Sequence, residues 1–149
     1  MKRMFIAVDF DGTCVTHEYP FIGKKIGAAP VLRELAKKHD IILYTMRDGE
    51  KLQDAVAWFK QNGIPLYAVN ENPSQKVWTD SPKVFAHLYI DDAALGTLTH
   101  TIEGYSDRDF VDWYRVVMHL ASAGFFSWDR AKELAEEIKK DFNTENHDK

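Results

Sequence analysis

The sequence is poor in cysteine, in long apolar runs and in excess positive charge, and each shortage removes a class of protein. Cys14 is the single cysteine among 149 residues, so the chain can form no intrachain disulfide and no zinc site built from several cysteines. No apolar stretch is long enough to cross a membrane. The net charge of -4 provides no broad basic surface for a polyanion. We therefore expect a cytoplasmic protein with no membrane partner, and nucleic acid is disfavoured as a partner without being excluded.

The length and composition fit one globular domain. A chain of 149 residues can bury a core of its own. Contents of 45% hydrophobic and 28% charged residues are ordinary for a soluble protein. No internal repeat or low-complexity linker divides the sequence, so we expect a single domain over residues 1–149.

Short apolar runs alternate with segments of helical periodicity along most of the chain. The predicted strands cover residues 4–8, 40–45, 64–70 and 86–90, and the predicted helices between them cover residues 30–38 and 50–62. Alternation of this kind favours right-handed crossovers. The pattern therefore predicts an α/β fold, a Rossmann-like parallel sheet with helices on both faces.

The C-terminal third departs from this alternation and predicts a pair of helices. Ser106 and Asp109 resemble a capping box, and an apolar stripe follows them. A second helix is predicted to start after Ser127, so the pair occupies residues 106–142. The remaining segments are a predicted loop or flap, 13–29, and a flexible tail, 143–149.

The first predicted strand ends in two carboxylates. Asp9 and Asp11 follow its apolar run two residues apart, so both point to the same side while the strand geometry lasts. Their mutual repulsion is relieved if a cation lies between them. The Asp-Gly turn of a hairpin is the alternative interpretation. The apolar run before it is, however, typical of a strand that is buried on both faces.

Polar side chains also follow the second and fourth predicted strands. Thr45 ends the second strand, Asp91 and Asp92 end the fourth, and Lys83 precedes the fourth. Because parallel strands present their carboxyl ends at one edge of the sheet, these groups should converge there with the two carboxylates of the first strand. Four carboxylates need positive charge, which a lysine and a magnesium ion would supply, and such a site suits phosphoryl groups. Gly12 would let the backbone approach a phosphate closely.

These residues resemble the four motifs of the haloacid dehalogenase superfamily. The run Asp9-Phe10-Asp11-Gly12-Thr13 is similar to the DxDGT first motif of that superfamily. Thr45 resembles the second motif, Lys83 the third, and Tyr89-Ile90-Asp91-Asp92 the acidic fourth. The C-terminal helices lie outside the four motifs.

The resemblance implies a function and a role for each residue. The function would be magnesium-dependent hydrolysis of a phosphate monoester through an aspartyl-phosphate intermediate. Asp9 would be the nucleophile, and Asp11 the general acid and base that is characteristic of phosphatases in the superfamily. The residues expected at the site are, for catalysis, Asp9, Asp11, Thr45 and Lys83; for substrate binding, Gly12, Thr13, Met46 and Arg47; and for magnesium, Asp9, Asp91, Asp92 and Asp11, the last through its backbone carbonyl.

Three of these positions have a second interpretation. Lys76 competes with Lys83 for the role of catalytic lysine, since both precede the fourth predicted strand. Asp92 either supports the metal or caps the turn that follows it. Thr45 taken alone would be an ordinary threonine at a strand end, and only its place after the second strand favours the catalytic role.

Residues close to the motifs also allow more than one interpretation. Arg47 either reaches the substrate or pairs with Asp48 or solvent. Cys14, His17 and His87 have no evident catalytic partner in the sequence, and we assign them no catalytic role.

The segments between the motifs are too short for an inserted cap domain. The site should therefore be open, covered at most by the flap of residues 15–23, the loop of residues 71–82 or a partner subunit in a homo-oligomer. The expected partner is a phosphorylated substrate, either a small molecule or the end of a macromolecule. The alternative function is a non-enzymatic phosphate-binding or receiver-like module. That alternative is disfavoured because the phosphoacceptor of receiver domains follows a later strand than Asp9 does.

Overall fold

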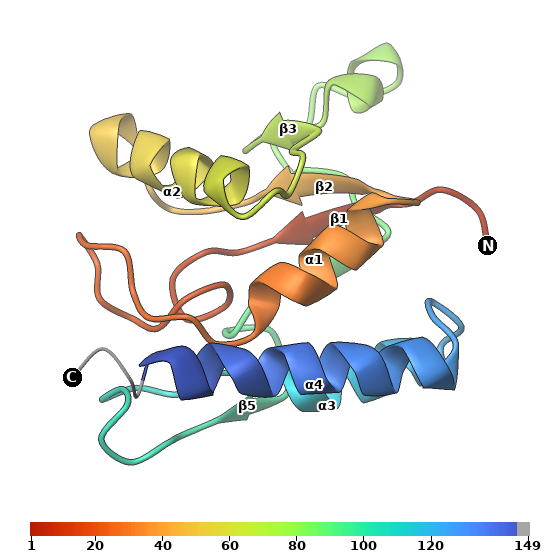
Figure 1. Cartoon of the computed structure of the whole chain (residues 1–149). Helices are drawn as coiled ribbons and strands as arrows, with labels where there is room; N and C mark the ends of the chain where they lie inside the picture. The colour runs from red at the N-terminus through yellow and green to blue at the C-terminus, as the bar shows by residue number, and fades with distance from the viewer. Residues whose placement is uncertain (146–149) are drawn as a thin grey trace.

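The computed structural model describes residues 1–145 and contains a four-stranded parallel sheet (Figure 1). Its strands are β1 (Phe5–Val8), β2 (Asp40–Leu43), β3 (Ala68–Val69) and β4 (Leu88–Ile90). They lie in the order β3-β2-β1-β4, so β1 is central and pairs with β2 on one side and β4 on the other. The α/β fold with a parallel sheet is the one that the sequence predicts.

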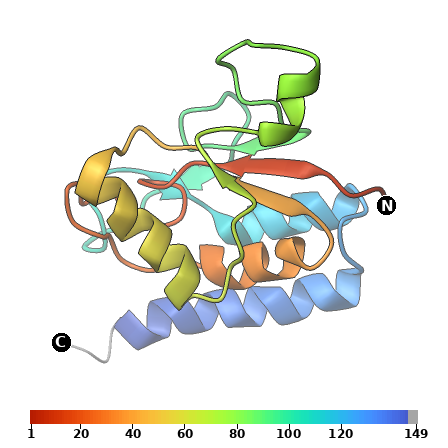
Figure 2. The same cartoon turned by 90° about the horizontal axis from the view of Figure 1, so that it is seen from above.

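Helices α1 (Ala28–Ala36) and α2 (Gly49–Gln61) connect the first three strands. Viewed from above, both lie on the same side of the sheet as the C-terminal helix (Figure 2). Val31, Leu32 and Leu35 of α1 are fully buried, as the apolar stripe predicts. Gly63, two residues beyond α2, has a φ of 68°, a left-handed conformation typical of the residue that follows a helix.

The connection between β3 and β4 covers the opposite face of the sheet (Figure 2). It contains η1, a 3₁₀ helix over Pro73–Val77, within the segment that the sequence predicts to be a loop. The buried side chain of Gln75 holds this segment together. Its amide nitrogen donates to the carbonyls of Ser81 and Lys83, and its amide oxygen accepts from the Phe85 N–H. Buried amides of this kind replace the backbone bonds that regular structure would provide.

Strand β3 is shorter than predicted, because its ladder begins at Ala68, preceded by a single hydrogen bond from the Tyr67 N–H to the Ile41 carbonyl. Only Ala68 and Val69 pair with β2. Pro65 has no N–H to donate, so the chain approaches the sheet as an irregular segment and joins it late.

The C-terminal part starts with a small antiparallel pair, β5 (Thr99–His100) and β6 (Phe110–Val111), followed by α3 (Trp113–Ser122) and α4 (Trp128–Glu145). The predicted pair of helices is therefore present, but the capping box at Ser106 and Asp109 was wrong. Asp112 caps α3 instead, where its side chain accepts from the Arg115 N–H. Phe110 lies in a buried strand rather than on the helix, because an apolar pair can satisfy either pattern over so few residues.

Helix α4 packs against α3 and α1 and closes the core on that side of the sheet. It continues to Glu145, so it includes the first residues of the predicted tail, and residues 146–149 of that tail lie outside the described residues. Within the described part of the chain, none of the helices combines the length and apolar character needed to cross a bilayer.

Candidate metal and phosphoryl site

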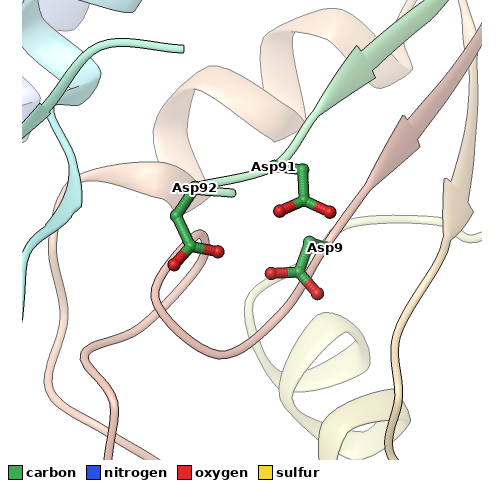
Figure 3. Close-up of side chains that lie close together, drawn as sticks. All are labelled: Asp9, Asp91 and Asp92. Carbon is green, nitrogen blue, oxygen red and sulfur yellow. The ribbon is translucent and has the colours of Figure 1, made fainter. Parts of the chain in front are cut away.

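The carboxyl ends of β1 and β4 bring three aspartates together. Val8 of β1 is in register with Ile90 of β4, so Asp9 and Asp91 leave the sheet side by side. Asp92 follows, and one carboxylate oxygen from each of Asp9, Asp91 and Asp92 lies within 4.8 Å of the others. The three side chains point toward one another from the two strand ends (Figure 3). The structure thus assembles three of the four predicted carboxylates into one cluster.

The Thr13 hydroxyl connects two members of this cluster. Its Oγ1 lies 3.0 Å from Asp9 Oδ2 and 3.3 Å from Asp92 Oδ1, and it accepts a hydrogen bond from the Asp92 N–H at 3.0 Å. Thr13 is fully buried, so no solvent competes for these contacts. In this structure Thr13 therefore orients the carboxylates, and this role differs from the predicted one of binding substrate directly.

The surroundings of Asp9 in this cluster raise the pKa of its carboxyl group. Burial, then the charge of Asp91 and the hydrogen bond with Asp92, raise the pKa of Asp9 from 3.8 to about 8. Within residues 1–145, no lysine or arginine forms an ion pair with any of the three carboxylates. The lysine and arginine side chains of this described part thus do not neutralise the cluster, and a histidine, His17, contacts it at Asp92.

This donor set fits a magnesium ion. Magnesium prefers oxygen ligands and is commonly held by one or two carboxylates together with water. A divalent cation among Asp9, Asp91 and Asp92 would supply the positive charge that the neighbouring side chains do not. Asp91 also accepts a hydrogen bond at Oδ1 from the Ala93 N–H at 2.8 Å, which holds one of its oxygens while leaving the other available.

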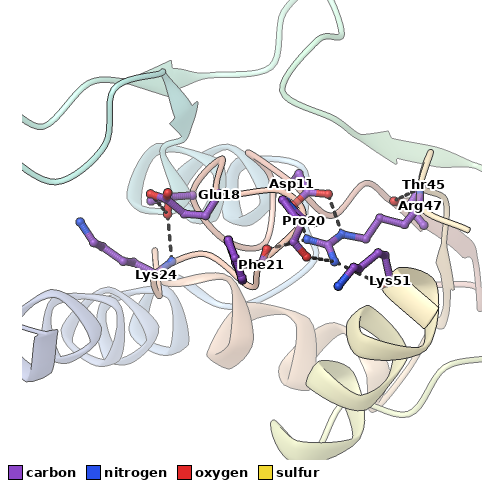
Figure 4. Close-up of polar contacts among 9 residues, drawn as sticks. Asp11, Glu18, Pro20, Phe21, Lys24, Thr45, Arg47 and Lys51 are labelled. Carbon is purple, nitrogen blue, oxygen red and sulfur yellow. Dashed lines mark hydrogen bonds and ion pairs between the residues drawn. The ribbon is translucent and has the colours of Figure 1, made fainter. Parts of the chain in front are cut away.

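Asp11 does not join the cluster, because Arg47 holds its carboxylate. Arg47 Nε and Nη2 donate to the two oxygens of Asp11, each at 2.8 Å, as shown in Figure 4. The same guanidinium donates to the backbone carbonyls of Pro20, Phe21 and Lys51. One arginine therefore joins the β1 loop, the flap and the start of α2.

The prediction that Arg47 contacts the substrate does not fit this arrangement. The Arg47 side chain is 1% exposed, and its donors are taken up by protein acceptors. The guanidinium also lies 4.9 Å from the centroid of the Phe10 ring and 5.2 Å from that of the Tyr19 ring, so two aromatic rings contact it as well. The alternative pairing with Asp48 is replaced by the bidentate pair with Asp11.

The other predicted residues of the second motif lie close to the strand end. The Thr45 hydroxyl accepts a hydrogen bond from the Arg47 N–H at 3.1 Å. The Thr45 N–H donates to the side-chain oxygen of Asn70 at 2.8 Å. Its hydroxyl can still donate a hydrogen bond, as the predicted contact with a phosphoryl group requires. Met46 is 97% exposed, so it is accessible to a substrate.

Neither candidate lysine contacts the carboxylate cluster in this structure. Lys83 is exposed in the segment before β4, where its backbone bonds to Ser81 and Gln75. Lys76, on η1, is exposed and lies 3.8 Å from Glu71. Among the described interactions, neither ammonium reaches the carboxylate cluster, so either lysine would have to move to meet a bound substrate.

His17 is a site residue that the sequence analysis missed. Its Nε2 lies 3.0 Å from Asp92 Oδ2, and both side chains are mostly buried, at 13% and 16% exposed. Nothing in the sequence singles out an isolated histidine in a flap of mixed polarity. The pairing depends on how the flap returns over the end of β4, which only the tertiary fold determines.

Two hydrogen bonds from the C-terminal part of the chain hold the loop that carries the first motif. The indole Nε1 of Trp113 donates to the Thr13 carbonyl at 2.7 Å, and the Val111 N–H donates to the Gly12 carbonyl at 2.9 Å. Cys14 is fully buried, and burial followed by the charges of Asp9 and Asp11 raises its thiol pKa. The thiol is therefore a packing group here, since thiolate formation is opposed.

Together, the fold and the site define an α/β protein with an acidic cluster at the carboxyl edge of a parallel sheet. No protein-family model and no curated protein matches the chain. A conserved protein from Bacteroides thetaiotaomicron, of solved structure, shares 32% sequence identity with it; the match covers 86% of this chain and 96% of that one, with a TM-score of 0.62. The chain belongs to the same protein family as that conserved protein.

Proposed function

We propose that the protein is a magnesium-dependent phosphatase that hydrolyses a phosphate monoester, with a haloacid dehalogenase type of mechanism. The observation that carries this proposal is the convergence of Asp9, Asp91 and Asp92 within 4.8 Å at the carboxyl edge of the sheet. The order of the motif residues along the chain supports it as well. Bound magnesium would supply positive charge to neutralise the phosphoryl oxygens during transfer.

Asp9 is the proposed nucleophile. One of its carboxylate oxygens attacks phosphorus, the bond from phosphorus to the leaving oxygen breaks, and an aspartyl phosphate forms. A water molecule then attacks the phosphorus of this intermediate, which releases inorganic phosphate and restores the carboxylate. Thr13, through its hydrogen bond to Asp9 Oδ2, holds the carboxylate in one orientation for the attack.

Asp11 is the proposed proton carrier, and Arg47 holds its carboxylate with two hydrogen bonds. The leaving oxygen needs a proton in the first step, and the attacking water loses one in the second. Both oxygens of Asp11 accept hydrogen bonds from Arg47. Each oxygen keeps a second lone pair that can take up a proton, so Arg47 holds Asp11 in place without blocking the transfer.

A generic aryl phosphate tests the proposal. The wild-type protein should hydrolyse p-nitrophenyl phosphate when magnesium is present and lose this activity in excess chelator. Asp9→Asn should lower the turnover rate by at least about 10³-fold, since a residue that forms the covalent intermediate has no substitute. Asp48→Asn is the matched control, because Asp48 is exposed and its side chain makes no capping bond. Magnesium-dependent turnover by Asp9→Asn at the wild-type rate would refute the mechanism.

The two candidate lysines can be separated in the same assay. Lys83→Ala and Lys76→Ala remove exposed side chains, so neither should change stability by more than about 0.5 kcal/mol. Loss of turnover in only one variant identifies the lysine that contacts Asp9 and the phosphoryl group. If both variants keep the wild-type rate, no catalytic lysine comes from this segment.

The receiver-like alternative makes a different prediction. A receiver module would accumulate phosphorylated Asp9 and hydrolyse it slowly. Incubation with acetyl phosphate and magnesium, followed by intact-mass measurement, would then give a stable gain of one phosphoryl group in the wild type and none in Asp9→Asn. The phosphatase proposal predicts instead that inorganic phosphate appears over many turnovers.

A further inference from the structure

His17 occupies the space between the first motif and Asp92. The backbone of Gly12 has a φ of 81°, and a Cβ added there would lie 2.0 Å from His17 Nε2 and 2.7 Å from Asp92 Oδ2. The imidazole thus rests directly on the Gly12 backbone. Glycine is required at this position for two reasons, since L side chains rarely adopt this φ and the ring leaves no room for a side chain. The predicted approach of a phosphate over Gly12 is replaced here by the approach of a histidine.

The contact with His17 determines which oxygen of Asp92 faces Asp9. The Thr13 hydroxyl lies between Asp9 Oδ2 and Asp92 Oδ1, which places Oδ1 on the side of Asp9. His17 Nε2 engages the other oxygen, Oδ2, at 3.0 Å. An ionised carboxylate only accepts hydrogen bonds, so Nε2 is the nitrogen that carries the hydrogen and donates. His17 thus fixes Oδ2 and leaves Oδ1 on the side of Asp9, beside the Thr13 hydroxyl.

The flap backbone holds His17 in this position. The Thr16 N–H donates to the Lys24 carbonyl, and the Thr16 hydroxyl accepts from the Lys24 N–H at 2.9 Å. Val15 forms an isolated bridge with Lys25 and another with Asp11. His17 therefore projects from a closed, hydrogen-bonded loop, and the geometry of its contact with Asp92 is built in before any ligand arrives.

We propose that His17 is a positioning residue for the metal site: its Nε2–H holds Asp92 Oδ2 so that Oδ1 points toward Asp9 and Asp91 and can meet a divalent cation. The inference rests on the proposed function, since it assumes that the three carboxylates bind magnesium. Partners that orient metal-binding carboxylates from outside the ligand shell typically change metal affinity by about 10- to 100-fold when removed. His17 thereby links the flap to the metal site.

Three substitutions separate the hydrogen bond from the packing of the ring. His17→Gln keeps a donor, because the glutamine amide nitrogen can reach the place of Nε2. His17→Leu keeps bulk and removes the donor, and His17→Ala removes both. His119→Ala is the matched control, since His119 is an exposed histidine on α3. These four variants, Asp91→Asn as a variant of the cluster itself, and the wild type are titrated with magnesium chloride by isothermal titration calorimetry, after thermal unfolding in chelator has established that each is folded.

We expect His17→Leu and His17→Ala to weaken magnesium binding by about 10- to 100-fold, and His17→Gln to remain within about 3-fold of the wild type. His119→Ala should bind as the wild type does. Magnesium binding by His17→Leu and His17→Ala with wild-type affinity would overturn the proposal. Equal weakening in the Gln, Leu and Ala variants would also overturn it, because the effect would then come from packing rather than from the donor.

The same titrations distinguish failure of this inference from failure of the proposed function. If the wild type binds magnesium, Asp91→Asn does not, and the His17 variants bind normally, only the role of His17 is refuted. If the wild type binds no magnesium, both the metal-dependent function and the positioning role are refuted. The rate of p-nitrophenyl phosphate hydrolysis adds a second readout. In His17→Leu the magnesium concentration at half-maximal rate should rise by the same factor as the dissociation constant, while saturating magnesium restores the rate.

Discussion

Replacing the proposed nucleophile should make the metal-free protein more stable. The pKa of Asp9 is raised to about 8, first by burial and then by the charge of Asp91 and the hydrogen bond with Asp92. In the unfolded chain Asp9 ionises near its ordinary pKa of 3.8. At a pH between these values the unfolded chain carries the charge and the folded chain holds a proton, so the Asp9 contribution destabilises the fold increasingly as pH rises. Asp9→Asn removes this penalty, because asparagine has nearly the same shape and no charge.

The size of the effect follows from the difference between the two pKa values. Each unit of difference corresponds to about 1.4 kcal/mol, so a rise from 3.8 to about 8 sets an upper bound of about 6 kcal/mol at pH values above both. Asparagine at this position disturbs the hydrogen bond with Thr13, at a cost of about 1–3 kcal/mol. We therefore expect a net gain of about 3 kcal/mol near pH 8 and almost none near pH 5.

Urea denaturation in chelator, followed by circular dichroism at several pH values, measures this effect. The quantity to plot is the free energy of unfolding of Asp9→Asn minus that of the wild type, which cancels the titration of all other groups. Its slope should be positive between about pH 5 and pH 8 and should reach at most about 1.4 kcal/mol per pH unit. Magnesium at 100 times its dissociation constant should remove most of the difference near pH 8, since it adds about 2.7 kcal/mol to the wild type only. A flat or falling difference would refute the electrostatic account of the cluster.

Three further substitutions test the contacts that hold the site. Arg47→Met leaves Asp11 without its partner and should lower the free energy of unfolding by about 3–5 kcal/mol; a loss below 1 kcal/mol in urea denaturation would contradict this. Gly12→Ala places a Cβ in space that is already filled and should cost at least about 2 kcal/mol and weaken magnesium binding in calorimetry; unchanged stability would mean that the loop adapts freely. Trp113→Phe leaves the Thr13 carbonyl unpaired and should cost about 1–3 kcal/mol by thermal unfolding, so a neutral result would show that the bond does not matter.

The pattern of strands and helices in the sequence is enough to predict the architecture and three carboxylates of the candidate site. Apolar runs that alternate with helical stripes predict βαβ units, and the parallel strands of such units have their carboxyl ends at one edge of the sheet. Asp9 and Asp91 each follow a strand directly and Asp92 comes one residue later, so the pairing of β1 with β4 was enough to bring them together. Residues that lie immediately beside regular structure inherit its geometry, and this is why these three could be predicted from spacing alone.

Only the tertiary structure decided which partner each remaining side chain meets. Arg47 pairs with Asp11, His17 pairs with Asp92, and Trp113 supports the first-motif loop from a helix that starts 100 residues later. Each of these contacts joins segments that no periodic pattern relates, because flap and loop conformations depend on packing against elements far away in the chain. The boundary between β6 and α3 also depends on tertiary packing. Two apolar residues are too few to show a strand or helix period, and it is the pairing with β5 that makes them a strand.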